Sequence, residues 1–178
     1  MSAHQRLQFR GGLGYRKDIR VLEDASFMSV ADRSILACWG VAGGRAGLPF
    51  RVTIDPGGPA ERVVDALADA EPVRAGEVIR IRTTGGGGWG DPLDRPYAEV
   101  LRDLRWRKIS PAGARDDYGV VVTGTPDDPA VDKAASDALR TARRAARGGA
   151  EPFFDRGPGY AMLAGQPSAD IDQPDGVG

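Results

Sequence analysis

The first half of the chain alternates polar and apolar residues, a spacing typical of strands that bury one face. We expect strands at residues 15–22, 26–32, 50–55 and 78–83. Residues 23–25 have the length of a hairpin turn between the first two, and the Pro-Gly-Gly-Pro sequence at 56–59 ends the third. The stretch 61–73 mixes acidic and apolar residues, so it fits either a strand or a short helix.

The pattern changes to helical spacing after Pro92. Apolar residues at 97, 100, 101 and 104 predict one helix, with Pro96 at its start. Ser110 followed by Pro111 is typical of an N-cap and first helical residue, which predicts a second helix to about Asp117. Residues 118–122 (YGVVV) are expected to form the last strand.

The clearest helix is predicted over residues 128–147. One side of it is expected to carry the apolar residues Val131, Ala134, Ala135, Ala138, Leu139, Ala142 and Ala145. Arg140, Arg143, Arg144 and Arg147 are expected to form a solvated basic end, and Gly148 and Gly149 to end the helix. These elements predict an α+β fold: a β-rich N-terminal half with a Gly-rich loop at 38–49, followed by two or three helices.

Composition narrows the class of protein. The 178 residues suit one domain, with 41% hydrophobic and 28% charged residues. A net charge of −1 gives no overall electrostatic attraction for nucleic acid, and no apolar run reaches membrane-spanning length. The N-terminus shows no secretory h-region, so a cytoplasmic location is expected. Glycine and proline, at 25 and 13 residues, predict many turns.

Residues 83–92 (TTGGGGWGDP) contain the most unusual sequence, the glycines 85–88. Successive glycine N–H groups can cradle a phosphate. The phosphate-loop pattern, however, needs Lys followed by Ser or Thr after the last glycine, and Trp89-Gly90-Asp91 stands there instead. We therefore favour a tight packing turn, including packing against a partner subunit, over nucleotide binding.

The other candidate chemical groups are isolated. Arg45 lies between glycines and has the chemistry to bind a carboxylate or phosphate, but we favour a plain surface role for it. Cys38 is expected to be a small buried residue, since His4 is the only histidine and lies near the N-terminus. No metal site is expected. Asp170, Asp172 and Asp175 are interpreted as keeping the tail solvated, and Asp116 and Asp117 as pointing in different directions on their helix.

Several motifs occur together in one order. They are residues 10–14 (RGGLG), 32–33 (DR), 39–40 (WG), 43–44 (GG), 84–93 (TGGGGWGDPL), 110–111 (SP), 118–121 (YGVV) and 154–160 (FDRGPGY). This order resembles the C-terminal part of the hydantoinase B/oxoprolinase family, the second component of ATP-dependent lactam and hydantoin hydrolases and of related acetone-type carboxylases. Two positions depart from the family: Trp89 replaces the usual Tyr or Phe, and Ala46 stands where proline is common.

The resemblance implies a division of the chain and of the chemistry. Residues 1–8 would be a flexible N-terminus, 9–148 a domain of the family's C-terminal type, and 149–178 a tail rich in Pro, Gly and Asp. The metal ligands of the related carboxylases lie upstream of the resembling region, so no metal ligand is carried over. No cofactor is expected on this chain. ATP and Mg would be used by a hydantoinase A-type partner, and a longer hydantoinase B-type N-terminal part would complete the unit.

These observations predict a small subunit or C-terminal portion that assists ATP-dependent hydrolysis of a cyclic amide and is not expected to be active alone. The alternatives are a non-catalytic structural or interaction module, or the equivalent part of an acetone-type carboxylase. The candidates for ligand or partner contact are Arg45, Gly85, Gly86, Gly87, Gly88, Trp89 and Asp91.

Overall fold

The computed structural model describes residues 8–149 and 153–165. Both strands and helices are present, with most strands in the N-terminal half, so the predicted α+β class is confirmed. The strands are β1 Arg16–Arg20, β2 Ala25–Val30, β3 Gly40–Val41, β4 Arg51–Ile54, β5 Arg62–Val64, β6 Leu67–Val73, β7 Val78–Arg82, β8 Val122–Gly124, β9 Pro129–Val131 and β10 Phe154–Asp155. The helices are a short 3₁₀ helix η1 Pro92–Asp94, then α1 Tyr97–Arg105, α2 Pro111–Tyr118, α3 Lys133–Arg147 and α4 Pro158–Leu163.

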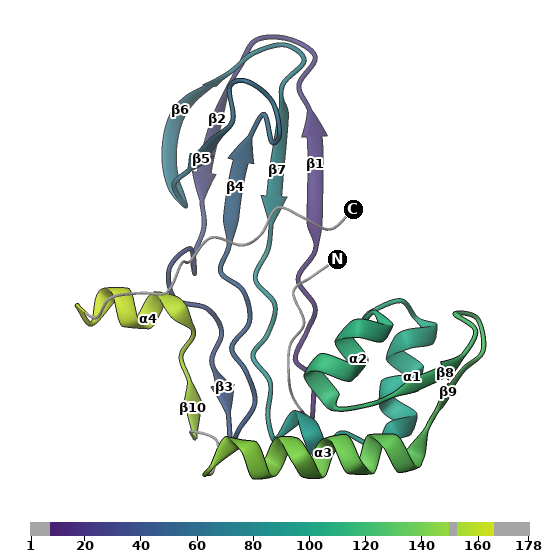
Figure 1. The fold of residues 1–178 in the computed structure, drawn as a ribbon. Helices are drawn as coiled ribbons and strands as arrows, with labels where there is room; N and C mark the ends of the chain where they lie inside the picture. The colour runs from purple at the N-terminus through teal and green to yellow at the C-terminus, as the bar shows by residue number, and fades with distance from the viewer. Residues whose placement is uncertain (1–7, 150–152, 166–178) are drawn as a thin grey trace.

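Strands β1, β2 and β4–β7 form one region, which we call the strand lobe (Figure 1). Four of them make an antiparallel sheet in the order β1-β7-β4-β5, and β2 pairs with β6 beside it. Alternate residues of β4 and β7 point inward and, with residues of β5 and β6, form an aliphatic core. The buried members of this core are Val52, Ile54, Val64, Val73 and Ile79. All five residues of β1 are exposed at the sheet edge.

Two predictions for this lobe need correction or completion. The hairpin at residues 23–25 is wrong, because β1 pairs with β7 and β2 pairs with β6. Residues 61–73, left open between strand and helix, form the two strands β5 and β6. The strands predicted around β4 and β7 are confirmed.

Helices η1 and α1–α3, with the β8–β9 pair, form the helical lobe. Its core contains Val100, Leu104, Ile109, Ala114, Tyr118 and Val120. The predicted cap of α2 is confirmed: the Ser110 Oγ accepts a hydrogen bond from the Gly113 N–H at 3.0 Å, with Pro111 in the first turn. A strand at 118–122 is wrong, because Tyr118 ends α2 and Gly119 (φ 62°) takes the left-handed conformation of a C-cap. The strand β8 begins only at Val122.

Helix α3 lies at the bottom of Figure 1, beneath the other helices and the extended segments that lead up to the strand lobe. It begins later than predicted, because residues 129–131 are strand β9 and Asp132 is the N-cap, accepting from the Ala135 N–H at 3.0 Å. The predicted end at Gly148 is confirmed by its φ of 68°. The apolar side is not the most buried one: Ala134, Ala138, Ala142 and Ala145 are exposed and Ala135 and Leu139 are partly buried. The buried residues of α3 are Ser136 and Arg140.

The described part of the predicted C-terminal tail lies against the rest of the chain. Strand β10 pairs with β3. Helix α4 begins after Gly157, and a Cβ atom at Gly159 would lie 1.8 Å from the Ile35 carbonyl oxygen, so the two backbones touch. The segments 1–7, 150–152 and 166–178 fall outside the described residues, and with them His4, Asp170, Asp172 and Asp175.

Candidate functional site

Three glycine-rich segments lie side by side, and we call them the glycine junction: residues 8–14 and 84–90, which are extended, and residues 38–47, which turn back on themselves at Ala42 and Gly43 (Figure 1). The central segment carries the glycine run. Its Gly86 N–H donates to the Gly12 carbonyl at 2.7 Å on one side, and its Gly88 N–H donates to the Arg45 carbonyl at 3.1 Å on the other. None of Gly85–Gly88 has a positive φ. The predicted tight turn is therefore wrong: the run is an extended strand of backbone between two others.

The junction needs glycine because its backbones touch. A Cβ atom at Gly87 would lie 1.6 Å from the Trp39 carbonyl oxygen, and one at Gly44 would lie 2.3 Å from the Gly88 carbonyl oxygen. Cβ atoms at Gly11 and Gly47 would meet the carbonyl oxygens of the run at 2.4 and 2.3 Å. The amides of Gly86 and Gly88 are used within the chain, which leaves them unsuited to cradling a phosphate. Close packing explains these glycines.

Large aromatic side chains stand exposed on this junction. Phe9 and Trp89 belong to neighbouring segments that pair through their backbones, and their ring centroids lie 5.5 Å apart. They are 59% and 51% exposed. Trp39 contacts Phe154 edge-on at 5.8 Å, and Phe154 contacts Phe153 at 4.7 Å. The junction therefore presents apolar rings on a backbone that cannot easily move.

Arg45 is half-exposed and faces a carboxylate of its own chain. Its Nη1 lies 3.9 Å from Asp155 Oδ2, the same oxygen that accepts the Ala46 N–H at 3.0 Å. These contacts hold β10 on the junction. The sequence suggested that Arg45 could bind a carboxylate, and in the structure that carboxylate belongs to Asp155 of the same chain.

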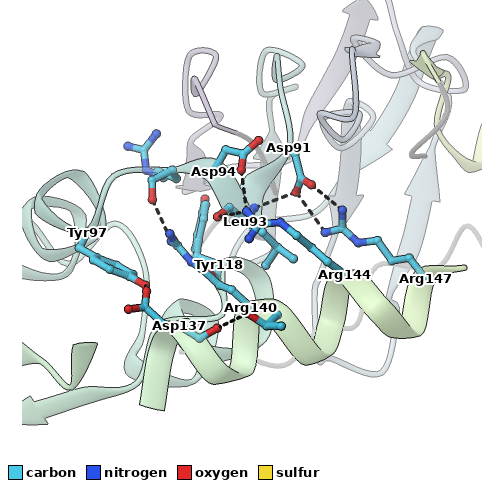
Figure 2. A network of polar contacts seen from close by, with 11 residues as sticks. Asp91, Leu93, Asp94, Tyr97, Tyr118, Asp137, Arg140, Arg144 and Arg147 are labelled. Atoms are coloured by element: carbon cyan, nitrogen blue, oxygen red, sulfur yellow. Dashed lines mark hydrogen bonds and ion pairs between the residues drawn. The ribbon is translucent and has the colours of Figure 1, made fainter. Parts of the chain in front are cut away.

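Asp91 links the junction to α3. Its Oδ1 accepts from the Leu93 N–H at 2.8 Å and so caps η1, and its two oxygens accept from Arg147 at 2.6 and 3.1 Å (Figure 2). Burial disfavours the charged carboxylate, but the hydrogen bonds from Arg147 and Leu93 outweigh it, so the pKa of Asp91 is lowered. The carboxylate therefore stays ionised.

The arginines of α3 were predicted to be a solvated end, and the structure corrects this. Figure 2 shows Arg140, Arg144 and Arg147 extending from α3 toward the body of the protein. Arg140 donates to the Tyr118 carbonyl at 3.0 Å and to the Arg95 carbonyl at 2.8 Å, and Arg144 donates to the Leu93 carbonyl at 3.0 Å and to Asp94 at 2.6 Å. Their spacing of four and three residues, which places them on one helical face, was the sequence signal for this role.

Another cluster carried no signal in the sequence. Arg10 and Arg95 are buried and share one carboxylate oxygen of buried Asp103, at 2.9 and 2.7 Å. The three residues come from the junction, the loop before α1, and α1 itself. Their separation along the chain hides the cluster from pattern analysis.

The described residues hold no group of three or more His, Cys, Asp or Glu placed to bind a metal ion. Cys38 is partly rather than fully buried. Among these same residues, no helix is long and apolar enough to cross a bilayer. Of the predicted contacts, the structure brings Arg45, Gly85–Gly88 and Trp89 together in the junction and places Asp91 at its edge. Their use in binding a ligand or partner stays a prediction.

Comparison with known proteins gives matches over most of the chain. Residues 8–92 match the family model described as hydantoinase B/oxoprolinase. A caprolactamase β subunit of Pseudomonas jessenii is 36% identical over 147 residues, covering 76% of this chain, and an uncharacterised protein of Methanocaldococcus jannaschii is 32% identical over 133 residues, covering 75%. The chain spans 23% of the length of each relative.

Among solved structures, the crystal structure of the ATP-dependent caprolactamase from Pseudomonas jessenii superposes with a TM-score of 0.56 at 32% identity. The match covers 76% of this chain and 24% of that one. The resemblance found in the motifs is thereby confirmed, and the chain belongs to the hydantoinase B/oxoprolinase family.

Proposed function

We propose that this chain is a docking part of a hydantoinase B-type component, assisting ATP-dependent hydrolysis of a cyclic amide. One observation carries the proposal: the family match spans residues 8–92, which contain all three segments of the glycine junction together with the strand lobe. The region that matches the family model therefore contains Phe9, Trp39 and Trp89 of the aromatic surface. The relatives named for caprolactamase support a lactam as the class of substrate.

The chemistry of an unstrained amide explains why such a component needs a docking surface. The amide carbon is a poor electrophile, and phosphorylation of its oxygen by ATP makes attack by water feasible. The activated intermediate must be kept from bulk water until it reacts at the intended position, which requires closed contact between the parts that make and use it. ATP and Mg would be bound by a hydantoinase A-type partner, and this chain would close the unit against a longer B-type chain.

The exposed rings are suited to that role. Aromatic residues carry much of the binding energy at protein interfaces, particularly when they are already held in place. Phe9 and Trp89 contact each other on segments whose glycines leave no room for movement of neighbouring backbones. We assign Trp89 and Phe9 as the principal partner contacts, with Gly85–Gly88 as their support.

The test is reconstitution. The chain would be co-expressed with a hydantoinase A-type subunit and a longer hydantoinase B-type chain, and ADP release would be measured with ε-caprolactam, 5-oxoproline and hydantoin. We expect ring opening only with all parts present, and Trp89→Ala to weaken association at least tenfold. Trp106→Ala is the matched control, since Trp106 is 59% exposed on the helical lobe, away from the junction. Ring opening by the isolated chain, or equal effects of both substitutions, would contradict the proposal.

A second candidate is a purely structural interaction module. It is favoured by one observation: the two charged candidates, Arg45 and Asp91, already pair with Asp155 and Arg147 of the same chain. The same reconstitution separates the two. A structural module would still assemble through Trp89. Leaving the whole chain out of the mixture, however, would not change the rate of ring opening by the other parts.

A further inference from the structure

A cleft of about 270 Å³ lies between the first segment of the junction and the start of α1. Its walls include Phe9, Arg10, Arg95, Pro96 and Arg102. The volume is near the lower end of the range typical of small-molecule sites, so the cleft suits a ligand of only a few heavy atoms. None of the predicted contact residues lines it.

Two arginines in this wall are almost fully enclosed. The side chains of Arg10 and Arg95 are 10% and 5% exposed. Both contact Asp103 Oδ2, and Arg10 Nη2 also donates to the Tyr118 hydroxyl at 3.3 Å, while Arg95 Nη1 donates to the Gln8 carbonyl at 2.7 Å. A charged side chain at such depth normally has every polar atom paired.

These two side chains do not reach that condition. The Nε and Nη1 atoms of Arg10 and the Nε of Arg95 are buried and have no hydrogen-bond partner among the described residues. Leaving a buried donor unpaired costs roughly 1–3 kcal/mol, and more for charged groups. Three such donors on two adjoining arginines indicate that an acceptor from outside the chain belongs here.

The charges around the cleft define the acceptor. Arg10, Arg95 and Arg102 contribute three positive charges, and the neighbouring carboxylates Asp103 and Glu99 contribute two negative ones. Glu99 is paired with Arg102 and lies 3.7 Å from Arg95, so one positive charge is left for a ligand. A monoanion balances it, whereas a phosphate dianion adds a charge that the walls do not match.

We propose that this cleft binds the carboxylate of a small aliphatic acid. A carboxylate has two oxygens with about four acceptor positions, enough for the N–H groups on the three unpaired nitrogens of Arg10 and Arg95. The ring of Phe9 and the side of Pro96 supply an apolar wall for a short carbon chain. The cleft adjoins the proposed docking surface through Phe9, but its ligating groups, on Arg10 and Arg95, belong neither to the glycine run nor to Trp89.

The direct test is an NMR titration of the unaltered chain labelled with ¹⁵N, following the Nε–H signals of arginine. Sodium butyrate is the probe, its uncharged amide butyramide is the isosteric control, and inorganic phosphate is the competing anion, all at constant pH and ionic strength. We expect saturable shifts of the Arg10 and Arg95 signals with butyrate, at least tenfold weaker binding of phosphate, and no saturation with butyramide. An absence of saturation would mean that water alone fills the cleft, and equal responses to butyramide or phosphate would mean that the ligand class is wrong; either result overturns the proposal.

Variants sharpen the same measurement. Arg10→Gln removes two of the unpaired donors and is expected to weaken butyrate binding at least tenfold. Arg105→Gln is the matched control, because Arg105 is an exposed arginine on α1 outside the cleft, and its butyrate affinity should equal that of the unaltered chain. Equal affinity in Arg10→Gln and Arg105→Gln would contradict the assignment. If Arg10→Gln fails to fold, the titration of the unaltered chain decides alone.

Discussion

The strand lobe and the helical lobe are stabilised by different means. In the strand lobe, Val52 and Ile54 are completely buried and pack among other aliphatic residues, as alternating strands predict. In the helical lobe, the long helix α3 turns its alanines to solvent and docks through Arg140 and its neighbours. Hydrophobic patterning therefore identifies the inner face only where apolar burial dominates the contact.

Arg140 shows why a basic face can be the buried one. Its guanidinium donates to two backbone carbonyls and lies 4.3 Å from the centre of the Tyr97 ring. Those carbonyls belong to Tyr118, which ends α2, and to Arg95, which follows η1, and such positions are short of backbone donors. Burial lowers the pKa of Arg140, yet the group keeps its charge because that pKa starts far above neutrality. The arginine supplies donors where the fold lacks them.

The largest loss of stability is expected from a substitution that forces apart the backbones of the glycine junction. Gly87→Ala places a Cβ atom 1.6 Å from the Trp39 carbonyl oxygen, so the neighbouring backbones must move apart. We expect a loss of more than about 3 kcal/mol in the free energy of unfolding, since backbone offers less relaxation than a side chain. Urea denaturation followed by tryptophan fluorescence measures this loss.

The control for that experiment lies on the same junction. A Cβ atom at Gly12 meets nothing within 4 Å, so Gly12→Ala should change stability by less than about 1 kcal/mol. Equal destabilisation by the two substitutions would refute close backbone packing as the reason for the glycines.

The next largest effect should come from the arginine face of α3. Arg140→Leu keeps an apolar stem but leaves the Tyr118 and Arg95 carbonyls without their donor, and we expect a loss of about 2–4 kcal/mol. Ala142→Gln, on the exposed face of the same helix, should stay within about 0.5 kcal/mol. The midpoints of urea unfolding of the two variants compare these losses. A larger loss in Ala142→Gln than in Arg140→Leu would mean that α3 packs through its alanine face.

A smaller and pH-dependent effect is expected at Asp91. Asn also caps a helix, so Asp91→Asn isolates the charge that meets Arg147, and we expect a loss of about 1 kcal/mol at pH 7. Because the folded-state pKa is lowered, this stabilisation is complete above the unfolded value of about 3.9 and is lost as pH falls through the folded pKa.

Urea unfolding at a series of pH values from neutrality into the acid range checks the sign. The gap between Asp91 and its Asn variant should narrow with acid, and Asp94→Asn, whose side chain is 52% exposed, should give a smaller gap throughout. A gap that widens in acid would show that the Arg147 contact does not stabilise the fold.

Sequence patterns predict what is local in this protein. The alternation of β4 and β7, the Ser110 cap of α2 and the glycine end of α3 each depend on residues within a few positions of one another. The glycine junction could not be predicted, because glycine has no side chain to form a pattern and the contacts join segments more than 25 residues apart, such as Gly11 with Gly87 and Gly44 with Gly88. The Arg10–Asp103 pair could not be predicted for the same reason, because its two residues also lie far apart in the sequence.

The charged edge of the sheet has a consequence for the chain in solution. An unpaired strand edge is a template for pairing with further copies, which leads to aggregation. Here β1 presents Arg16, Lys17, Asp18 and Arg20, all exposed, and the opposite edge strand β5 is only three residues long. Both ends of this four-stranded sheet therefore discourage the addition of another strand.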